Sequence, residues 1–212
     1  MSSTSVPESI NLGKRTPGDD LNITFSLNRT LSSDVDDVLK TQGVLWVIRT
    51  AVAYASIELH VHLYTLEDTG VEKFESTQVV GTVAKSEEPR TMDGQEREFS
   101  SPVYGPVAGH SGRVTTEQAG AYAPFLARGW ASDTAKLDAE NGGGLIYATS
   151  HGDTTKPNGY DWTSQQVFGF ADIEVDEGVF ERKYVCRLVF TSPSLKAPLE
   201  KRIVFDFVSL DG

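Results

Sequence analysis

Alternation of apolar and polar residues is most regular over residues 56–64, where Ser-Ile-Glu-Leu-His-Val-His-Leu-Tyr separates into two faces. Successive side chains of a β-strand point to opposite sides. One side of such a strand carries an unbroken aliphatic row, and the other carries Glu58, His60, His62 and Tyr64. The pattern predicts a half-buried strand and leaves open whether the polar row faces solvent or an enclosed cavity.

The last third of the chain also predicts strands. Apolar segments at 145–150, 165–175, 181–191 and 202–210 are separated by short stretches that contain Gly or Pro, and connections this short favour an antiparallel meander. Upstream, we expect further strands at 21–27, within the apolar run 44–66, and at 71–84. The Asp-Gly pair within residues 92–95 favours a hairpin turn, which we expect to project or to form an edge.

Helical signals are few and short. Residues 34–42 follow Ser33, carry acidic residues in the first turn and end before Gly43, which predicts a helix of about two turns. Residues 115–118 have the spacing of a capping box, and Pro124 limits any helix there to a turn or two. The wider segment 105–143 lacks strong periodicity, and loops of that length are often functional.

These elements predict an all-β fold in one domain. We expect a closed antiparallel β-barrel of about eight to ten strands with one or two short helices, because closure removes the exposed edges of a long meander. A two-sheet jelly roll is the alternative. The chain of 212 residues is long enough for a single buried core. Residues 1–20, rich in Ser, Pro, Gly and charge, predict a mobile N-terminal arm, which leaves 21–212 as the barrel domain.

Charge narrows the expected partners. The net charge of −11 comes from 30 acidic and 19 basic residues, and it argues against binding to nucleic acid or to an anionic membrane, since both need a basic surface. No apolar run is long enough to span a membrane. The N-terminus lacks the pattern of a secretory signal, and the single Cys186 cannot form an internal disulfide, so we expect a cytoplasmic protein. Its oligomeric state stays open, with a homodimer as one option.

The pair His60-x-His62 raises the question of a metal site, because two histidines on one strand face can bind one ion. With Glu67 after it, this pair resembles in part the first motif of the cupins. Where the second cupin motif would place its histidine, this chain has Trp162. We therefore predict no metal and no cofactor, and we keep a cupin-like metal-dependent enzyme as an alternative.

The second use for the polar row is inside a barrel. A barrel of about eight strands can hold one small ligand, and histidine beside Glu or Tyr can transfer protons near neutral pH. We therefore name His60, His62, Glu58 and Tyr64 as candidate catalytic residues. The candidates for the walls of a substrate pocket are aromatic: Trp46, Tyr54, Tyr104, Trp130, Trp162 and Phe170.

Four stretches of the chain, 90–98, 101–113, 162–170 and 182–190, are similar to a group of lipocalin-like barrel proteins of fungal type. They include Ser-Pro-Val-Tyr-Gly-Pro-Val-Ala-Gly-His-Ser-Gly-Arg113 and Trp162-Thr-Ser-Gln-Gln-Val-Phe-Gly-Phe170, and together they cover part of the chain. The resemblance implies a small barrel that acts as a cofactor-free cyclase or isomerase in secondary metabolism. It assigns no catalytic residues.

Together these observations predict a barrel that encloses a small hydrophobic molecule and catalyses its cyclisation or isomerisation without a cofactor. Such a cavity accelerates a reaction by holding a flexible substrate near its reactive conformer. A barrel that only binds its ligand is the first alternative, and the cupin-like enzyme is the second.

Overall fold

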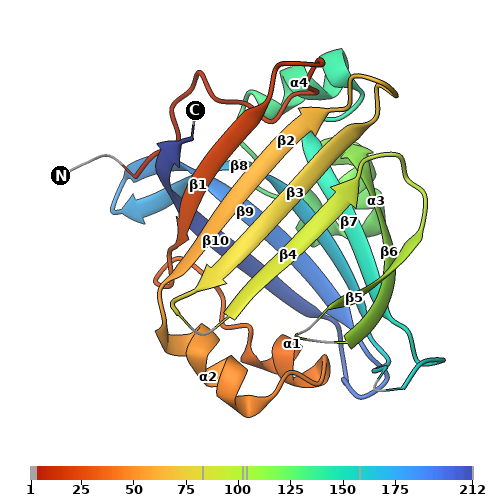
Figure 1. Ribbon diagram of the computed structural model, residues 1–212. Helices are drawn as coiled ribbons and strands as arrows, with labels where there is room; N and C mark the ends of the chain where they lie inside the picture. The colour runs from red at the N-terminus through yellow and green to blue at the C-terminus, as the bar shows by residue number, and fades with distance from the viewer. Residues whose placement is uncertain (1–3, 83, 102, 104, 158, 212) are drawn as a thin grey trace.

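Within the residues that the structure describes, ten antiparallel strands form one sheet that rolls into a nearly closed barrel (Figure 1). The structure is a computed structural model, and it describes residues 4–82, 84–101, 103, 105–157 and 159–211. Neighbouring strands follow the order β4-β3-β2-β1-β10-β9-β8-β7-β6-β5. The strands are β1 (Leu21–Leu27), β2 (Ile57–Thr65), β3 (Glu72–Val80), β4 (Ala84–Thr91), β5 (Arg97–Ser101), β6 (Gly105–Val114), β7 (Leu145–Gly152), β8 (Thr163–Asp176), β9 (Val179–Thr191) and β10 (Leu199–Leu210).

The all-β barrel predicted from the sequence is confirmed, and so is the C-terminal meander, which forms β7 to β10. Short helices complete the fold. They are α1 (Asp36–Thr41), α2 (Trp46–Tyr54), α3 (Thr116–Tyr122), the 3₁₀ helix η1 (Pro124–Ala127) and α4 (Thr134–Asn141). None of the helices in the described part of the chain is long and apolar enough to cross a membrane.

Two of the helices agree with the sequence signals and two do not. Helix α1 lies inside the expected range 34–42, and α3 begins with the capping box between Thr115 and Gln118. The strand expected at the start of the 44–66 run is wrong, because residues 46–54 form α2. A short apolar run suits a strand and a helix equally well. Helix α4 was not predicted.

The barrel has a seam between β4 and the β5–β6 pair. In the described part of the chain, β4 pairs with β3 alone and β5 pairs with β6 alone, so the hairpin expected around Asp93-Gly94 does not join its two flanking strands. Instead, the Gly94 N–H donates to the Ser111 carbonyl of β6 at 2.9 Å, which ties the turn across the seam. Beside it, the buried Arg113 on β6 forms a bidentate pair with Glu72 on β3, at 2.6 and 3.0 Å. These contacts close one end of the barrel.

Residues 4–20 cover that same end. The composition predicted a mobile arm, but the structure places three of its side chains in the core: Val6, Ile10 and Leu12 are 2%, 4% and 1% exposed. Arg182, on β9, donates to the Pro7 and Ile10 carbonyls at 3.0 and 2.7 Å. Apolar burial and an interior arginine therefore dock the arm on the barrel end. Residues 1–3 lie outside the described residues.

The sheet is covered on both faces over part of its area. Inside, an apolar core fills the end of the barrel near the arm. Outside, α3, η1 and the residues after η1 cover β7, β8 and β9 with a second apolar cluster that includes Leu126, Tyr147 and Val167. Helices α1 and α2 lie across the opposite end of the barrel (Figure 1). This arrangement leaves the interior next to α1 and α2 as the place for a site.

Candidate functional site

A cavity of about 540 Å³ occupies the barrel interior beneath α1 and α2. The open ends of the strands form its wall, and the two helices with the preceding loop form its cover. Its volume falls inside the range of about 300–1,000 Å³ that is typical of small-molecule pockets. The barrel is therefore hollow at one end and packed at the other.

The packed end is filled by aromatic rings, which explains where the cavity stops. Phe25 stacks on Tyr184 with ring centroids 4.6 Å apart, and Phe74 lies 5.4 Å from Phe168. Each of these side chains is at most 9% exposed. Further from the arm, β3, β4 and β8 present smaller and polar side chains, so the interior there is not filled.

The cavity wall is divided by polarity. All polar residues that the strands contribute to it come from β3, β4 and β8, and they are Gln78, Ser86, Glu88, Ser164 and Gln166. A wall of this kind can orient a ligand, because its apolar part takes the hydrocarbon surface while its few polar groups select an orientation.

The remaining strand walls are apolar. β1, β2, β9 and β10 contribute Leu27, Ile57, Leu188, Ile203 and Phe205. Around the barrel, β5, β6 and β7 lie between β4 and β8, and the seam separates β4 from β5. The four apolar strands form the opposite side of the barrel. The polar residues thus form an arc that includes the seam.

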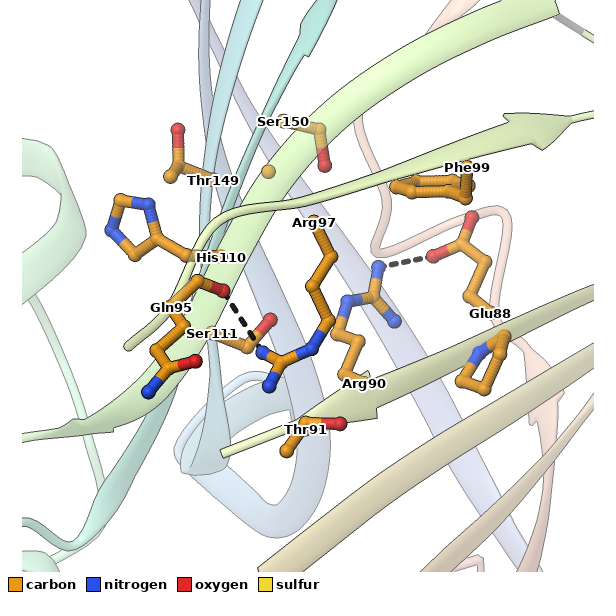
Figure 2. A pocket seen from close by; sticks show the side chains of 12 residues that line it. Glu88, Arg90, Thr91, Gln95, Arg97, Phe99, His110, Ser111, Thr149 and Ser150 are labelled. Atoms are coloured by element: carbon orange, nitrogen blue, oxygen red, sulfur yellow. Dashed lines mark hydrogen bonds and ion pairs between the residues drawn. The ribbon is translucent and has the colours of Figure 1, made fainter. Parts of the chain in front are cut away.

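Glu88 of this arc forms an ion pair with Arg90, two residues further along β4 (Figure 2). Both project from β4 toward the interior, and the Arg90 guanidinium also donates to the Ser76 hydroxyl at 3.2 Å. It lies 5.8 Å from the Phe74 ring centroid and 5.7 Å from that of Phe168, in cation–π geometry. Arg90 therefore joins the polar arc to the aromatic core.

A second, smaller pocket of about 50 Å³ lies at the seam (Figure 2). Glu88 lines both this pocket and the main cavity. Arg97 and Phe99 of β5 and Ser111 of β6 form the opposite side of the seam pocket. The Glu88 carboxylate thus stands between the two spaces.

Two ionisable side chains deeper in the core stay uncharged near neutral pH. Burial raises the pKa of the Cys186 thiol to about 12 and raises that of the Tyr184 phenol well above its usual value, while the Arg90 charge opposes both shifts in part. Among the atoms of the described residues, the Tyr184 hydroxyl has no hydrogen-bond partner. Among the described strand residues that line the cavity, Glu88 is the charged one, and Arg90 beside it carries the opposite charge.

The cover of the cavity is thin. Helix α2 has no buried residue, and Trp46 and Tyr54 on it are 71% and 85% exposed. An ion pair of 2.6 Å between Arg49 of α2 and Asp36 of α1 joins the two helices, and both side chains line the cavity. A helix with so little buried surface opens at low free-energy cost, so we expect a ligand to enter the cavity at α2.

The polar row on β2 lies outside this cavity. Leu59, Val61 and Leu63 face the interior core, which by the two-residue period turns the other row outward. The side chains of His60 and His62 are 42% and 34% exposed. The sequence left open which way this row faces, and on β2 it faces the outer surface.

The four residues of the row bond to neighbours on the outer surface. His60 Nδ1 lies 2.8 Å from Thr24 Oγ1, and Glu58 lies 3.8 Å from His60. His62 Nε2 lies 3.3 Å from a carboxylate oxygen of Asp20. The Tyr64 hydroxyl donates to Glu75 at 2.8 Å, and burial, followed by this carboxylate, raises the Tyr64 pKa. A catalytic role for the row stays a prediction.

The six aromatic residues predicted to line a pocket are scattered. Tyr54 lines the cavity, and Trp46 lies exposed on the same helix. Trp162 and Phe170 are buried in separate core clusters, and Trp130 packs on the outer face of the sheet. Tyr104 lies outside the described residues. Their roles as substrate-binding residues therefore stay predictions.

The sequence did not reveal the polar arc, because the charged residues of β4 are typical of a strand face exposed to solvent. Ala84, Ser86, Glu88 and Arg90 occur at every second position of β4, which is the period of a strand face. Strand faces rich in charge usually face water, and only the seam and the cavity make this face an interior one. Residues 85–88 carry charge on both faces, so alternation gave no hydrophobic signal there.

A metal site with the His60–His62 pair has no counterpart in the structure. No group of three or more His, Cys, Asp or Glu side chains in the described parts of the chain is arranged to hold a metal ion.

Comparisons with known proteins add little to this description. No family model and no curated protein matches the chain. Among solved structures, the chain is similar to a point mutant of the REP1-NXSQ fatty acid transporter, with 12% sequence identity over 87% of this chain and 95% of that one and a TM-score of 0.44. A similarity this distant carries no argument about function.

Proposed function

We propose that the chain binds a small, mostly apolar molecule in the barrel cavity. The observation that carries this proposal is the divided wall, in which a polar arc that includes Gln78, Glu88 and Gln166 faces apolar strands across a volume of about 540 Å³. A cavity with one polar side suits a molecule with a hydrocarbon body and a polar group at one edge.

The polar groups of the arc favour an uncharged ligand. The two glutamine amides can each donate and accept hydrogen bonds. The Glu88 carboxylate accepts only, and Arg90 already balances its charge. A ligand with a hydroxyl, carbonyl or amide group satisfies these partners without leaving an uncompensated charge in the interior.

The cyclisation or isomerisation expected from the sequence belongs to this proposal as its finer part. Its groups would now come from the cavity, where Glu88 can accept a proton and the amides of Gln78 and Gln166 can polarise a carbonyl. Enclosure would hold a flexible substrate near its reactive conformer. Glu58, His60, His62 and Tyr64 would not take part, since they lie outside the cavity.

Binding is tested with an uncharged fluorescent probe, 1-N-phenylnaphthylamine. We expect a saturable, one-to-one increase in emission, which a molecule extracted from the purified protein displaces. A linear, unsaturable signal would refute binding in the cavity. The catalytic part is tested by incubating that extracted class of molecule with the protein, because cyclisation or isomerisation changes its chromatographic retention and leaves its mass unchanged. Glu88→Gln should keep probe binding and lose this conversion.

A further inference from the structure

Three arginines gather on the outer face of the barrel, away from the cavity. Arg187 of β9 and Arg202 of β10 occupy directly paired positions in the sheet, so their Cβ atoms lie about 5 Å apart on one face. Cys186 next to Arg187 belongs to the interior core, which places Arg187 on the outer face. Arg128 follows η1, which packs over β9, and it is exposed.

Arg187 is buried in an unusual way. It is 7% exposed, and its guanidinium lies 5.2 and 5.4 Å from the centroids of the Phe125 and Trp130 rings. Its Nε is buried without a hydrogen-bond partner among the described residues. Cation–π contacts offset part of the cost of burying the charge, but they leave the Nε N–H donor unused.

No carboxylate within the described parts of the chain forms an ion pair with any of the three arginines. Burial, followed by the positive charges of Arg202 and Arg128, lowers the pKa of Arg187 to about 10. Like charges at directly paired strand positions destabilise a sheet. The repulsion between these arginines therefore destabilises the protein on its own. The chain has 30 acidic residues that could have neutralised them.

Two other buried cations of β9 are neutralised by carboxylates of the chain. Arg182 pairs with Asp133, and Lys183, which is 1% exposed, pairs with Glu181 and Asp206 at 2.5 and 2.6 Å. Two of the buried cations of β9 thus have carboxylate partners from the chain, and Arg187 has none among the residues that the structure describes. A partner from outside the chain would complete the pattern.

We propose that the three arginines form a binding site for an oxyanion, a phosphate or carboxylate group of a small molecule. Guanidinium groups present paired N–H donors that match the oxygens of such groups. The site is reached from solvent at Arg128 and Gly129, which are exposed. A Cβ at Gly129 would lie 3.1 Å from Arg187 Nη2, so Gly129 lies directly beside the end of the guanidinium.

The site is independent of the proposed cavity function, because its three arginines lie on the opposite face of the sheet from the cavity wall. Occupation would neutralise the repulsion between Arg187 and Arg202 and would fix the segment after η1 on β9. We therefore expect bound oxyanion to stabilise the fold.

The test is calorimetric titration of the full chain with inorganic phosphate and, separately, with citrate, each at an ionic strength matched with chloride. We expect saturable one-to-one binding of at least one of them, and the preferred ion separates phosphate from carboxylate chemistry. Arg128→Gln and Arg202→Gln should each weaken binding about tenfold or more, because each removes a charge-assisted contact. Lys136→Gln, which removes an equal charge from the exposed face of α4, should not.

Thermal unfolding gives a second readout. Phosphate or citrate should raise the melting temperature of the wild type and of Lys136→Gln, and chloride at equal ionic strength should not. In buffer without phosphate or citrate, the melting temperature of Arg202→Gln should fall below that of the wild type by no more than the loss of the hydrogen bond to the Leu31 carbonyl explains. The proposal is overturned if neither ion binds saturably, or if Arg128→Gln and Arg202→Gln bind as the wild type does.

Discussion

The ion pair between Glu72 and Arg113 should be a main support of the closed barrel end. The side chains are 4% and 9% exposed, and the pair joins β3 to β6 across the end where the sheet has its seam. Glu72→Gln removes the negative charge and leaves the guanidinium buried with one amide oxygen and the Leu12 and Gly143 carbonyls as acceptors. Breaking a buried pair in this way costs about 3–5 kcal/mol of the free energy of unfolding.

For a chain of this length, each kcal/mol lowers the melting temperature by about 2–4 °C, so we expect a decrease of at least about 6 °C. Urea unfolding at pH 7 should show the same loss as a lower midpoint with an unchanged slope. The control is Asp93→Asn, which breaks the pair of Asp93 with Arg97. That pair is 2.6 Å long but partly exposed, so its loss should cost at most about 1 kcal/mol.

A double variant, Glu72→Gln with Arg113→Met, tests whether the uncompensated charge causes the loss of stability. It removes the uncompensated charge, so it should be more stable than Glu72→Gln alone. If Glu72→Gln costs no more than Asp93→Asn, the pair does not hold the barrel end, and the account of the seam is refuted.

Three further predictions concern the cover, the outer strand face and the core. Asp36→Asn breaks the ion pair between α1 and α2, and stopped-flow mixing should show faster probe release with a change in stability of at most about 1 kcal/mol; unchanged release would exclude α2 as the entry. His60→Ala and His62→Ala, which alter an outward row, should leave probe affinity unchanged and shift stability by about 0.5 kcal/mol or less, by urea unfolding. A loss of affinity would contradict the orientation of β2. Cys186, with its pKa raised to about 12, stays protonated at pH 8, so Ellman's reagent should react with it only on unfolding; rapid labelling of the native protein would contradict its burial.

Much of the fold could be predicted because its strands alternate clearly and its turns are short. The row Ile57 to Leu63 identified β2, and the Gly- and Pro-containing connections identified β7 to β10. The direction of β2 could not be predicted, since alternation shows that two faces differ and not which one faces a cavity. In a partly filled barrel, the aliphatic face packs into the interior.

The site itself escaped prediction for a related reason. Its polar arc depends on contacts between strands far apart in the sequence, such as β4 and β8, and on a seam that no local pattern shows. The burial of Arg187 depends in the same way on η1, which lies about 60 residues earlier in the chain. From the sequence alone, a single charged residue within a strand is expected to be exposed to solvent. Its burial can be recognised only when the segment that covers it is known.

The most direct test of the cavity uses two neighbouring glutamines of β8. Gln166 faces the cavity, whereas Gln165 points to the outer face and donates to the Tyr147 hydroxyl at 3.2 Å. Gln166→Trp fills the interior, and Gln165→Trp adds the same side chain outside. Titration with 1-N-phenylnaphthylamine should show loss of saturable binding for Gln166→Trp, with wild-type affinity for Gln165→Trp and native circular dichroism for both. Equal affinity of the two folded variants would show that the probe, and by inference the ligand, does not bind inside the barrel.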